Sequence, residues 1–289
     1  MKVINLNSQN VISCECGNVF EFGYADYEVQ FASASEDFFQ VGVRCPICGK
    51  LHLQAPDNYD DTKSKENLLK YRSPMDECSY ADLKVRIDKY YETGAVPFEI
   101  GDSKTITLKN GDKTSFVFIG QDLYYAQKTG SRAPLSFVFA DCLRDDQPMN
   151  RASTNRGGWR NSYMRKWLNE EFVKLVPEEL MGIIKVSKKW TMNSGETPTA
   201  TDDNFYLLSE IEVFGKNSYS YDGEGVQYEF FKNWRNRVRT RAEYEYGLYW
   251  WLRSPNRDYS YYFCYVSISG GVDYSTAGNS YGVSPAFNL

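Results

Sequence analysis

The sequence predicts an α+β protein in which short antiparallel strands and a few helices form a large C-terminal domain behind a small N-terminal module. Short runs of alternating apolar and polar residues, separated by turn residues, are typical of antiparallel strands. Apolar residues at helical spacing occupy 162–172. Four of the seven cysteines lie within the first 48 residues, which sets this region apart from the rest of the chain.

The N-terminal module is expected at residues 1–55, where the cysteines form two pairs. The pairs are Cys14 with Cys16 and Cys45 with Cys48, and short strands are expected between them at 20–22 and 41–43. Thiolates at such spacing chelate one tetrahedral Zn²⁺ in zinc ribbons. We therefore predict a structural zinc ion on Cys14, Cys16, Cys45 and Cys48, with His52 as a substitute ligand. A disulfide or unrelated thiols are the alternative, and the lack of a secretory signal favours the metal.

Residues 56–94 are expected to connect the module to the main domain, with a helix at about 80–91. In the main domain, at 95–289, Asn110-Gly111 separates two alternating runs and predicts a hairpin of 104–108 with 115–120. Met164, Trp167, Leu168 and Phe172 define the buried face of the helix at 162–172. The apolar runs 183–186 and 205–208 are expected to be buried strands.

Composition excludes several functional classes. Acidic residues outnumber basic ones by 38 to 33, which disfavours general nucleic-acid binding. No apolar run is long enough to span a membrane. His52 is the only histidine, so Ser-His-Asp catalysis, Cys-His catalysis and multi-histidine metal centres have little to build on. The composition therefore favours a binding protein over an enzyme, and Cys78, Cys142 and Cys264 are expected in the core.

Four arginines, at 235, 237, 239 and 241, form a local basic cluster after Trp234. Alternating charges of this kind are expected on a solvated or salt-bridged face. In a chain of net charge −5 they make only a weak nucleic-acid patch.

The C-terminal segment has an unusual composition. Residues 256–281 contain six Tyr, five Ser, two Asn and two Asp. Cys264, Val266 and Ile268 are expected on the inner face of a strand that turns back at Gly270-Gly271, with Tyr and Ser on its outer face. Tyrosine among small polar residues is the chemistry of antibody binding surfaces, because Tyr offers a large rigid contact area at low entropic cost.

Five residue types, Lys, Glu, Gln, Trp and Met, are missing from 252–289, although they make up 57 of the 289 residues in the whole chain. An AAY asparagine codon randomised at its two adenines can never encode these five types. The same codon does encode Tyr, Ser, Asn, Asp and Gly. The bias therefore fits adenine-directed mutagenesis, and an ordinary Tyr-rich strand region is the alternative.

Several motifs together resemble a known family. They are Gly157-Gly158-Trp159 leading into the helix, Leu207-Leu208-Ser209-Glu210, and the segments 249–255 and 282–289. Over residues 95–289 the chain resembles the C-type-lectin-fold variable proteins of gut bacteria and phages, which are diversified by retroelements. The zinc-ribbon-like module is not part of that fold.

The resemblance implies a non-enzymatic protein that presents a variable region, here about 252–289, to an unknown protein or cell-surface ligand. Assembly as a homo-oligomer, or on a virion or cell surface, is the expected context, and location in the cytoplasm or on a phage particle follows from the missing signal peptide. The candidate variable positions are Arg257, Asp258, Tyr259, Ser260, Tyr261, Tyr262, Tyr265, Ser267, Ser269, Asp273, Tyr274, Ser275, Asn279 and Tyr281.

Two alternatives stay open at this point. Formylglycine-generating oxidases resemble the same fold, but they need paired reactive cysteines or metal-binding histidines. A zinc-ribbon nucleic-acid adaptor would use the arginine cluster, and its affinity for DNA would fall with salt.

Overall fold

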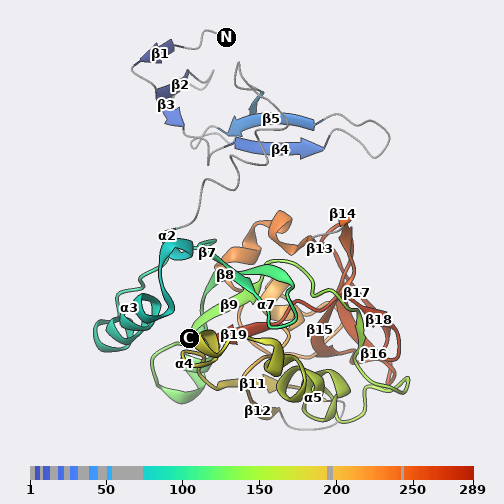
Figure 1. Ribbon diagram of the computed structural model, residues 1–289. Coiled ribbons are helices and arrows are strands. Elements are labelled where there is room, and N and C mark those ends of the chain that lie inside the picture. Colours follow the sequence, from blue (N-terminus) through green and yellow to red (C-terminus); the bar gives the residue numbers. More distant parts are fainter. Residues whose placement is uncertain are drawn as a thin grey trace. The chain divides into compact units, whose positions relative to one another are not determined.

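The computed structural model describes residues 74–289, apart from 194–197 and 242–243 and the side chains of 244–245, together with the backbone of six strands before residue 54. The chain divides into two compact units, Met1–Tyr71 and Arg72–Leu289. The strands pair antiparallel in both units and helices accompany them in the second, which confirms the α+β class (Figure 1).

The first unit contains two three-stranded sheets, ordered β1-β2-β3 and β4-β5-β6. The short strands expected at 20–22 and 41–43 are confirmed, because they fall within β3 and β5. The predicted zinc ligands Cys14, Cys16, Cys45 and Cys48 lie outside the described residues, as does the side chain of His52. The bounds are β1 (Ile4–Leu6), β2 (Gln9–Ser13), β3 (Val19–Phe22), β4 (Tyr27–Phe31), β5 (Phe39–Arg44) and β6 (Leu51–Leu53).

The main sheet of the second unit has the order β19-β9-β8-β7, so the C-terminal strand pairs with a strand far earlier in the chain (Figure 1). The expected hairpin is confirmed, and Gly111 in its turn has φ of 91°. That left-handed conformation favours glycine, because a Cβ would clash with the backbone. The bounds are β7 (Ser103–Thr107), β8 (Lys113–Gln121), β9 (Leu135–Phe139) and β19 (Ala286–Asn288).

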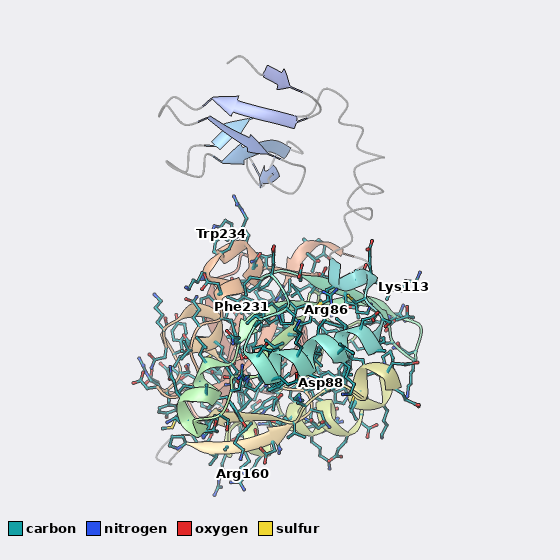
Figure 2. The ribbon with its side chains drawn as sticks, turned by 90° about the vertical axis from the view of Figure 1, so that its left-hand side faces the viewer. Arg86, Asp88, Lys113, Arg160, Phe231 and Trp234 are labelled. Atoms are coloured by element: carbon teal, nitrogen blue, oxygen red, sulfur yellow. The ribbon has the colours of Figure 1, made fainter. Side chains whose placement is uncertain are left out.

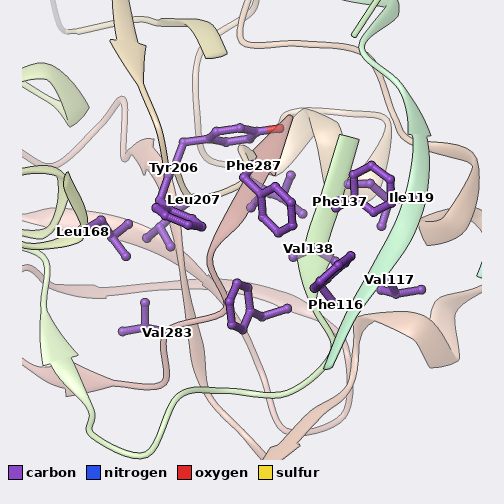
Figure 3. Packing of buried hydrophobic residues seen from close by; sticks show 14 of the residues in the cluster. Phe116, Val117, Ile119, Phe137, Val138, Leu168, Tyr206, Leu207, Val283 and Phe287 are labelled. Atoms are coloured by element: carbon purple, nitrogen blue, oxygen red, sulfur yellow. The ribbon is translucent and has the colours of Figure 1, made fainter. Parts of the chain in front are cut away.

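Phenylalanines from β8, β9 and β19 form the centre of the core (Figure 3). Phe116 meets Phe287 edge-on at 5.2 Å between ring centroids, and Phe137 stacks on Phe287 at 5.6 Å. Such pairs stabilise the core beyond the apolar area that they bury. The predicted helix is confirmed as α5 (Tyr163–Glu170), which packs Met164 and Leu168 into the same core. Of the other two residues of its expected buried face, Trp167 is only partly buried, and Phe172 is buried but lies beyond the helix in η3 (Phe172–Leu175).

The helix expected in the connecting segment belongs to the second unit. It is α3 (Tyr80–Thr93), with a capping box at Ser79 and a left-handed Gly94 as its C-cap. Leu83, Ile87 and Tyr90 are buried, whereas Arg86 and Asp88 lie on the outward face (Figure 2). The remaining helices are α2 (Pro74–Glu77), α4 (Leu123–Thr129), η2 (Trp159–Asn161), η3 (Phe172–Leu175), α6 (Glu178–Met181), α7 (Glu210–Phe214), η4 (Glu229–Lys232) and η5 (Trp234–Arg237).

A second three-stranded sheet, of order β15-β16-β17, carries most of the C-terminal segment. The hairpin around Gly270-Gly271 is confirmed, but Ile268 is not on its inner face. Strand β16 ends at Val266, so Ile268 lies in the turn and is exposed. The bounds are β15 (Trp250–Pro255), β16 (Tyr262–Val266) and β17 (Val272–Thr276), and three two-stranded ribbons join β10 (Gln147–Pro148) to β18 (Ser280–Tyr281), β11 (Ser187–Thr191) to β12 (Thr199–Asp203), and β13 (Arg239–Arg241) to β14 (Tyr244–Leu248).

Two expected strands are wrong in detail. The run 183–186 is not a strand, because β11 begins only at Ser187 and Val186 is exposed. The inward residues of β11 are instead Ser187, Lys189 and Thr191, which is a polar set. The run 205–208 is fully buried as expected, but only Tyr206 forms a bridge, to Ala286.

Candidate functional site

The loop between β15 and β16 is held in place by hydrogen bonds to its backbone atoms. The Asn155 side-chain amide donates to the carbonyl oxygens of Asn256, Tyr259 and Tyr262 at 3.0 to 3.1 Å. The Asn155 backbone N–H donates to Ser260 O, and the Asn256 side-chain oxygen accepts from the N–H groups of residues 258 and 259. Asn155 and Asn256 are both buried. Two asparagines therefore fix the path of the loop, and the side chains at 257–261 take no part in these bonds.

The candidate variable positions differ in exposure. Tyr259 and Tyr261 keep 45% and 42% of their surface exposed, whereas Tyr265 keeps only 9%. The expected outward position of Tyr265 is therefore wrong, because its ring packs against Trp251. Exposed positions are Arg257, Asp258, Tyr259, Ser260, Tyr261, Ser269, Asp273 and Asn279, and partly buried ones are Tyr262, Ser267, Tyr274, Ser275 and Tyr281.

Five tyrosines gather around this loop, and we call Tyr219, Tyr259, Tyr261, Tyr262 and Tyr274 the loop cluster. Tyr262 stacks on Tyr274 at 5.1 Å, and Tyr261 meets Tyr262 edge-on at 4.6 Å. Tyr219 contacts Tyr274 edge-on at 4.9 Å. The cluster therefore forms one connected aromatic surface, and four of its five members are candidate variable positions.

Tyr219 reaches this surface because a buried carboxylate holds its loop. Glu210, at the start of α7, accepts backbone N–H bonds from Ser218, Tyr219 and Ser220 at 2.6 to 3.2 Å. The Tyr221 hydroxyl donates to the carbonyl of Arg257 at 3.0 Å. The segment 218–221 is thus tied both to the core and to the loop between β15 and β16. Tyr219, Tyr221 and Asn155 were not among the predicted site residues, because contacts across about forty or a hundred residues leave no local pattern in the sequence.

A second group of rings, Tyr249, Trp251, Tyr265 and Tyr281, forms what we call the strand cluster. Tyr281 lies 4.8 Å from Trp251 and 5.2 Å from Tyr265 between ring centroids. The Tyr265 hydroxyl donates to Asp273, and burial together with Asp273 raises the pKa of that phenol. The Asn279 amide donates to the Ser275 hydroxyl, which also hydrogen-bonds Tyr281. Candidate positions in and beside the strand cluster are therefore hydrogen-bonded to one another.

The β16–β17 register separates the two clusters. Cys264 pairs with Tyr274, and Tyr265 pairs with Asp273. Because side chains alternate across a strand, Tyr262 and Tyr274 share one face while Tyr265 and Asp273 share the other. The sequence predicted one outer face of Tyr and Ser. In the structure the tyrosines lie on two faces of the hairpin, which have different surroundings.

Strand β15 contributes Arg253 to a network of buried charges, which we call the ionic core. Arg253 on β15 pairs with Glu212, and the other carboxylate oxygen of Glu212 accepts from Lys189 at 3.2 Å. Lys189 also pairs with Asp122 at 2.6 Å. Burial would raise the pKa of Glu212, but Arg253 and Lys189 bring it below its ordinary value. Buried charges of this kind are stable only when they are paired, so the ionic core orients β11, α7 and β15 against one another.

One further buried carboxyl lies beside the ionic core. Burial raises the pKa of Glu224 to about 7, even though Arg253 and hydrogen bonds favour its charged form. The Ser254 hydroxyl donates to one of its oxygens, and the backbone N–H of Met192 donates to the other at 3.1 Å. Glu224 therefore titrates near neutral pH inside the core.

The arginine cluster does not form the expected solvated face throughout. Arg239 is buried, and its guanidinium lies 5.5 Å from the ring centroids of both Phe231 and Trp250. Burial lowers the pKa of Arg239 to about 10. Arg241 pairs with Asp146 and Trp234 projects outward (Figure 2). Alternating arginines therefore point in different directions, because they lie on η5 and on strand β13.

The three isolated cysteines are buried, as expected of core residues. Burial raises the pKa of the Cys142 thiol to about 12, so it stays protonated at neutral pH. Cys264 donates to Glu210 at 3.8 Å, and burial together with that carboxylate raises its pKa well above the ordinary value. Among residues 74–289 as described, no group of three His, Cys, Asp or Glu side chains is placed to hold a metal ion.

A cavity of about 250 Å³ lies between the β7–β8 turn and the segment 141–145, and no residue of the β16–β17 hairpin lines it. Its lining is apolar at Trp167, Phe172 and Leu175. It is charged at Arg144 and Asp112, which form an ion pair at 3.2 Å. No helix within the described part of the chain is long and apolar enough to cross a membrane.

The chain matches one family model, the Domain of unknown function (DUF6273), over residues 135–289. The matched region holds β9, the ionic-core residues Lys189, Glu212 and Arg253, and all of both ring clusters. No curated protein and no solved structure gave a match to the chain. Because the match spans more than half of the residues, the chain belongs to the DUF6273 family.

Proposed function

We propose that this protein binds a macromolecular ligand through the loop cluster and the adjoining side chains of residues 257–261. The observation that carries the proposal is the attachment of the loop by backbone bonds to Asn155 and Asn256. Side chains at 257–261 can change without breaking those bonds. A binding surface on such a loop can acquire new specificities while the scaffold stays folded.

The composition of the surface supports a protein or cell-surface ligand. Tyr259 and Tyr261 are exposed, and they stand beside the charged pair Arg257 and Asp258. Burying a tyrosine at the centre of an interface contributes about 1 to 3 kcal/mol. A few such rings suffice for specific affinity when their positions are preorganised.

We further propose that the second unit has a C-type-lectin-like fold and is the target of a diversity-generating retroelement. The support is the resemblance in residues 95–289 and the lack of Lys, Glu, Gln, Trp and Met in 252–289. A genome carrying this gene is expected to hold a reverse transcriptase gene nearby, with an imperfect repeat that differs from the stretch encoding residues 252–289 only at adenines. Differences spread evenly over all four bases would contradict this origin.

For the first unit we propose a zinc-ribbon-like module. Four thiolates from Cys14, Cys16, Cys45 and Cys48 are the donor set that a closed tetrahedral Zn²⁺ site requires, so the metal would stabilise the fold and take no part in catalysis. One equivalent of zinc in the purified protein, lost in a Cys45→Ser, Cys48→Ser variant, tests this assignment. A zinc content unchanged by the double substitution would overturn it.

The ligand surface can be tested without knowing the natural ligand. The full chain is displayed with positions 257–261 and 274 randomised by AAY-derived codons, and binders are selected against hen lysozyme as a defined protein target. A matched library randomises six exposed positions of α3, namely 84, 85, 86, 88, 89 and 92. We expect folded binders from the first library and none from the second. Equal success of both libraries, or unfolding of most members of the first, would contradict the proposal.

A further inference from the structure

Lys189 is held between two carboxylates in the interior. Its ammonium nitrogen lies 2.6 Å from Asp122 Oδ2 and 3.2 Å from Glu212 Oε1. The side chains of Lys189 and Asp122 are 1% and 4% exposed. Asp122 follows β8 and Lys189 lies on β11, so the contact joins two elements separated by 67 positions.

Aromatic rings enclose this contact. The Tyr206 ring centroid lies 4.2 Å from Lys189 Nζ, and the Tyr228 hydroxyl accepts from the same nitrogen at 3.0 Å. Both tyrosines are buried. An amine and a carboxyl group held together in a dry site have a very high effective concentration, and little water is present to favour hydrolysis.

We propose that Lys189 and Asp122 condense spontaneously to form an intramolecular amide cross-link. The bond from Lys189 Nζ to Asp122 Cγ forms, the bond from Cγ to Oδ2 breaks, and one water molecule leaves. The two protons that the ammonium loses are the two that the departing oxygen gains, so no external reagent is needed. Glu212 accepts a proton from Nζ and returns it to Oδ2, which is general acid–base catalysis by a positioned carboxylate.

The resting state before this reaction is an ion pair. Burial alone would lower the pKa of the Lys189 ammonium, but Asp122 and Glu212 raise it well above its ordinary value. The reactive neutral pair forms when one proton crosses the short hydrogen bond to Oδ2. Because formation of the amide in a closed site is effectively irreversible, a small reactive fraction suffices for complete conversion after folding.

The surroundings suit the product as well as the reactants. Asp122 Oδ1 already accepts the backbone N–H of Tyr125 at 3.0 Å as the cap of α4, and it would keep that role as the amide oxygen. The remaining amide N–H can donate to Glu212. Condensation removes one buried positive and one buried negative charge, and the Arg253–Glu212 pair remains balanced.

The same strand supplies an internal control. Lys188 pairs with Asp202 at 3.7 Å, and their side chains are 43% and 61% exposed. This is also a Lys–Asp pair, but it is in contact with water and has no buried acid beside it. They are expected to remain unlinked.

The test is the mass of the full chain, folded during expression and then denatured. We expect the mass to be lower than that of the sequence by one water molecule. A tryptic digest should contain a branched peptide joining 114–128 to 189–216, because trypsin cannot cleave after a modified Lys189. Asp222-Gly223 can also lose water by forming a succinimide, so the branched peptide identifies the site.

Four variants sharpen the test. Lys189→Arg and Asp122→Ala should restore the full mass, Lys188→Arg should keep the loss of water, and Glu212→Gln should slow the reaction. The wild-type digest decides the matter even if a core variant fails to fold. Unlinked peptides 114–128 and 190–216 from folded wild-type protein would overturn the proposal, because trypsin cleaves after an unmodified Lys189.

Discussion

The loop cluster and the strand cluster lie on opposite faces of one hairpin and are built from the same residue type. In the loop cluster, Tyr259 and Tyr261 are exposed on a loop held by backbone bonds to Asn155. In the strand cluster, Tyr265 is buried against Trp251 and its hydroxyl is bonded to Asp273. The comparison teaches that a tyrosine is free to vary only where the backbone, and not the ring, holds the chain in place.

The largest expected effect separates the two faces directly. Tyr265→Ala should lower the free energy of unfolding by about 4 kcal/mol, because it leaves a cavity beside Trp251 and Tyr281. Tyr265→Phe keeps the ring and loses only the bond to Asp273, so it should cost about 1 kcal/mol. Chemical denaturation measures both values. Similar losses in the two variants would mean that the hydroxyl, and not the ring, stabilises this face.

The next prediction concerns the attachment of the loop. Asn155→Ala removes two side-chain N–H donors that three loop carbonyls share, and it should cost about 3 kcal/mol, at about 1.5 kcal/mol for each donor. Hydrogen exchange should rise in 256–262 more than in β9. Asn161→Ala, at an exposed position nearby, is the matched control and should leave stability unchanged. An equal effect of the two substitutions would show that backbone attachment does not hold the loop.

The pH dependence of stability tests a buried carboxyl group that belongs to neither cluster. The pKa of Glu224 rises from 4.5 to about 7 on folding because of burial. Between these values the folded protein holds a proton that the unfolded chain has lost, so raising the pH from 4.5 to 7 destabilises the fold. The expected loss is about 3 kcal/mol, at about 1.4 kcal/mol for each pKa unit.

A Glu224→Gln variant isolates this effect, since the amide oxygen can still accept from Ser254. The difference in unfolding free energy between wild type and variant should change over pH 4.5 to 7 and level off above it. A difference that stays constant over this range would show that Glu224 does not titrate there.

The smallest expected effect on stability comes from the loop cluster. Tyr259→Ala and Tyr261→Ala should each change the free energy of unfolding by less than about 0.5 kcal/mol, because both rings are exposed. In a binder selected on this surface, the same substitutions should weaken affinity at least about tenfold, or about 1.4 kcal/mol. A loss of stability comparable to that of Tyr265→Ala would remove the distinction between the two clusters.

Local patterns were sufficient for the elements that are stabilised by neighbours in sequence. The turn at Asn110-Gly111, the face of α5 and the hairpin around Gly270-Gly271 follow from turn chemistry and from helical or alternating periodicity. The strand predicted at 183–186 is wrong, because a short apolar run near the surface has the same sequence pattern as a buried strand. Strand β11 buries Lys189 only because Asp122 and Glu212, distant in sequence, neutralise its charge.

The sequence by itself determined the α+β class, most strand and helix positions, and the concentration of Tyr and Ser in the last forty residues. Only the tertiary structure decided which tyrosines are exposed, that Asn155 anchors their loop, and that Lys189 and Arg253 are buried with their counter-ions. The physical reason is that exposure and pairing depend on what packs behind a side chain. That environment is assembled from segments far apart in the chain.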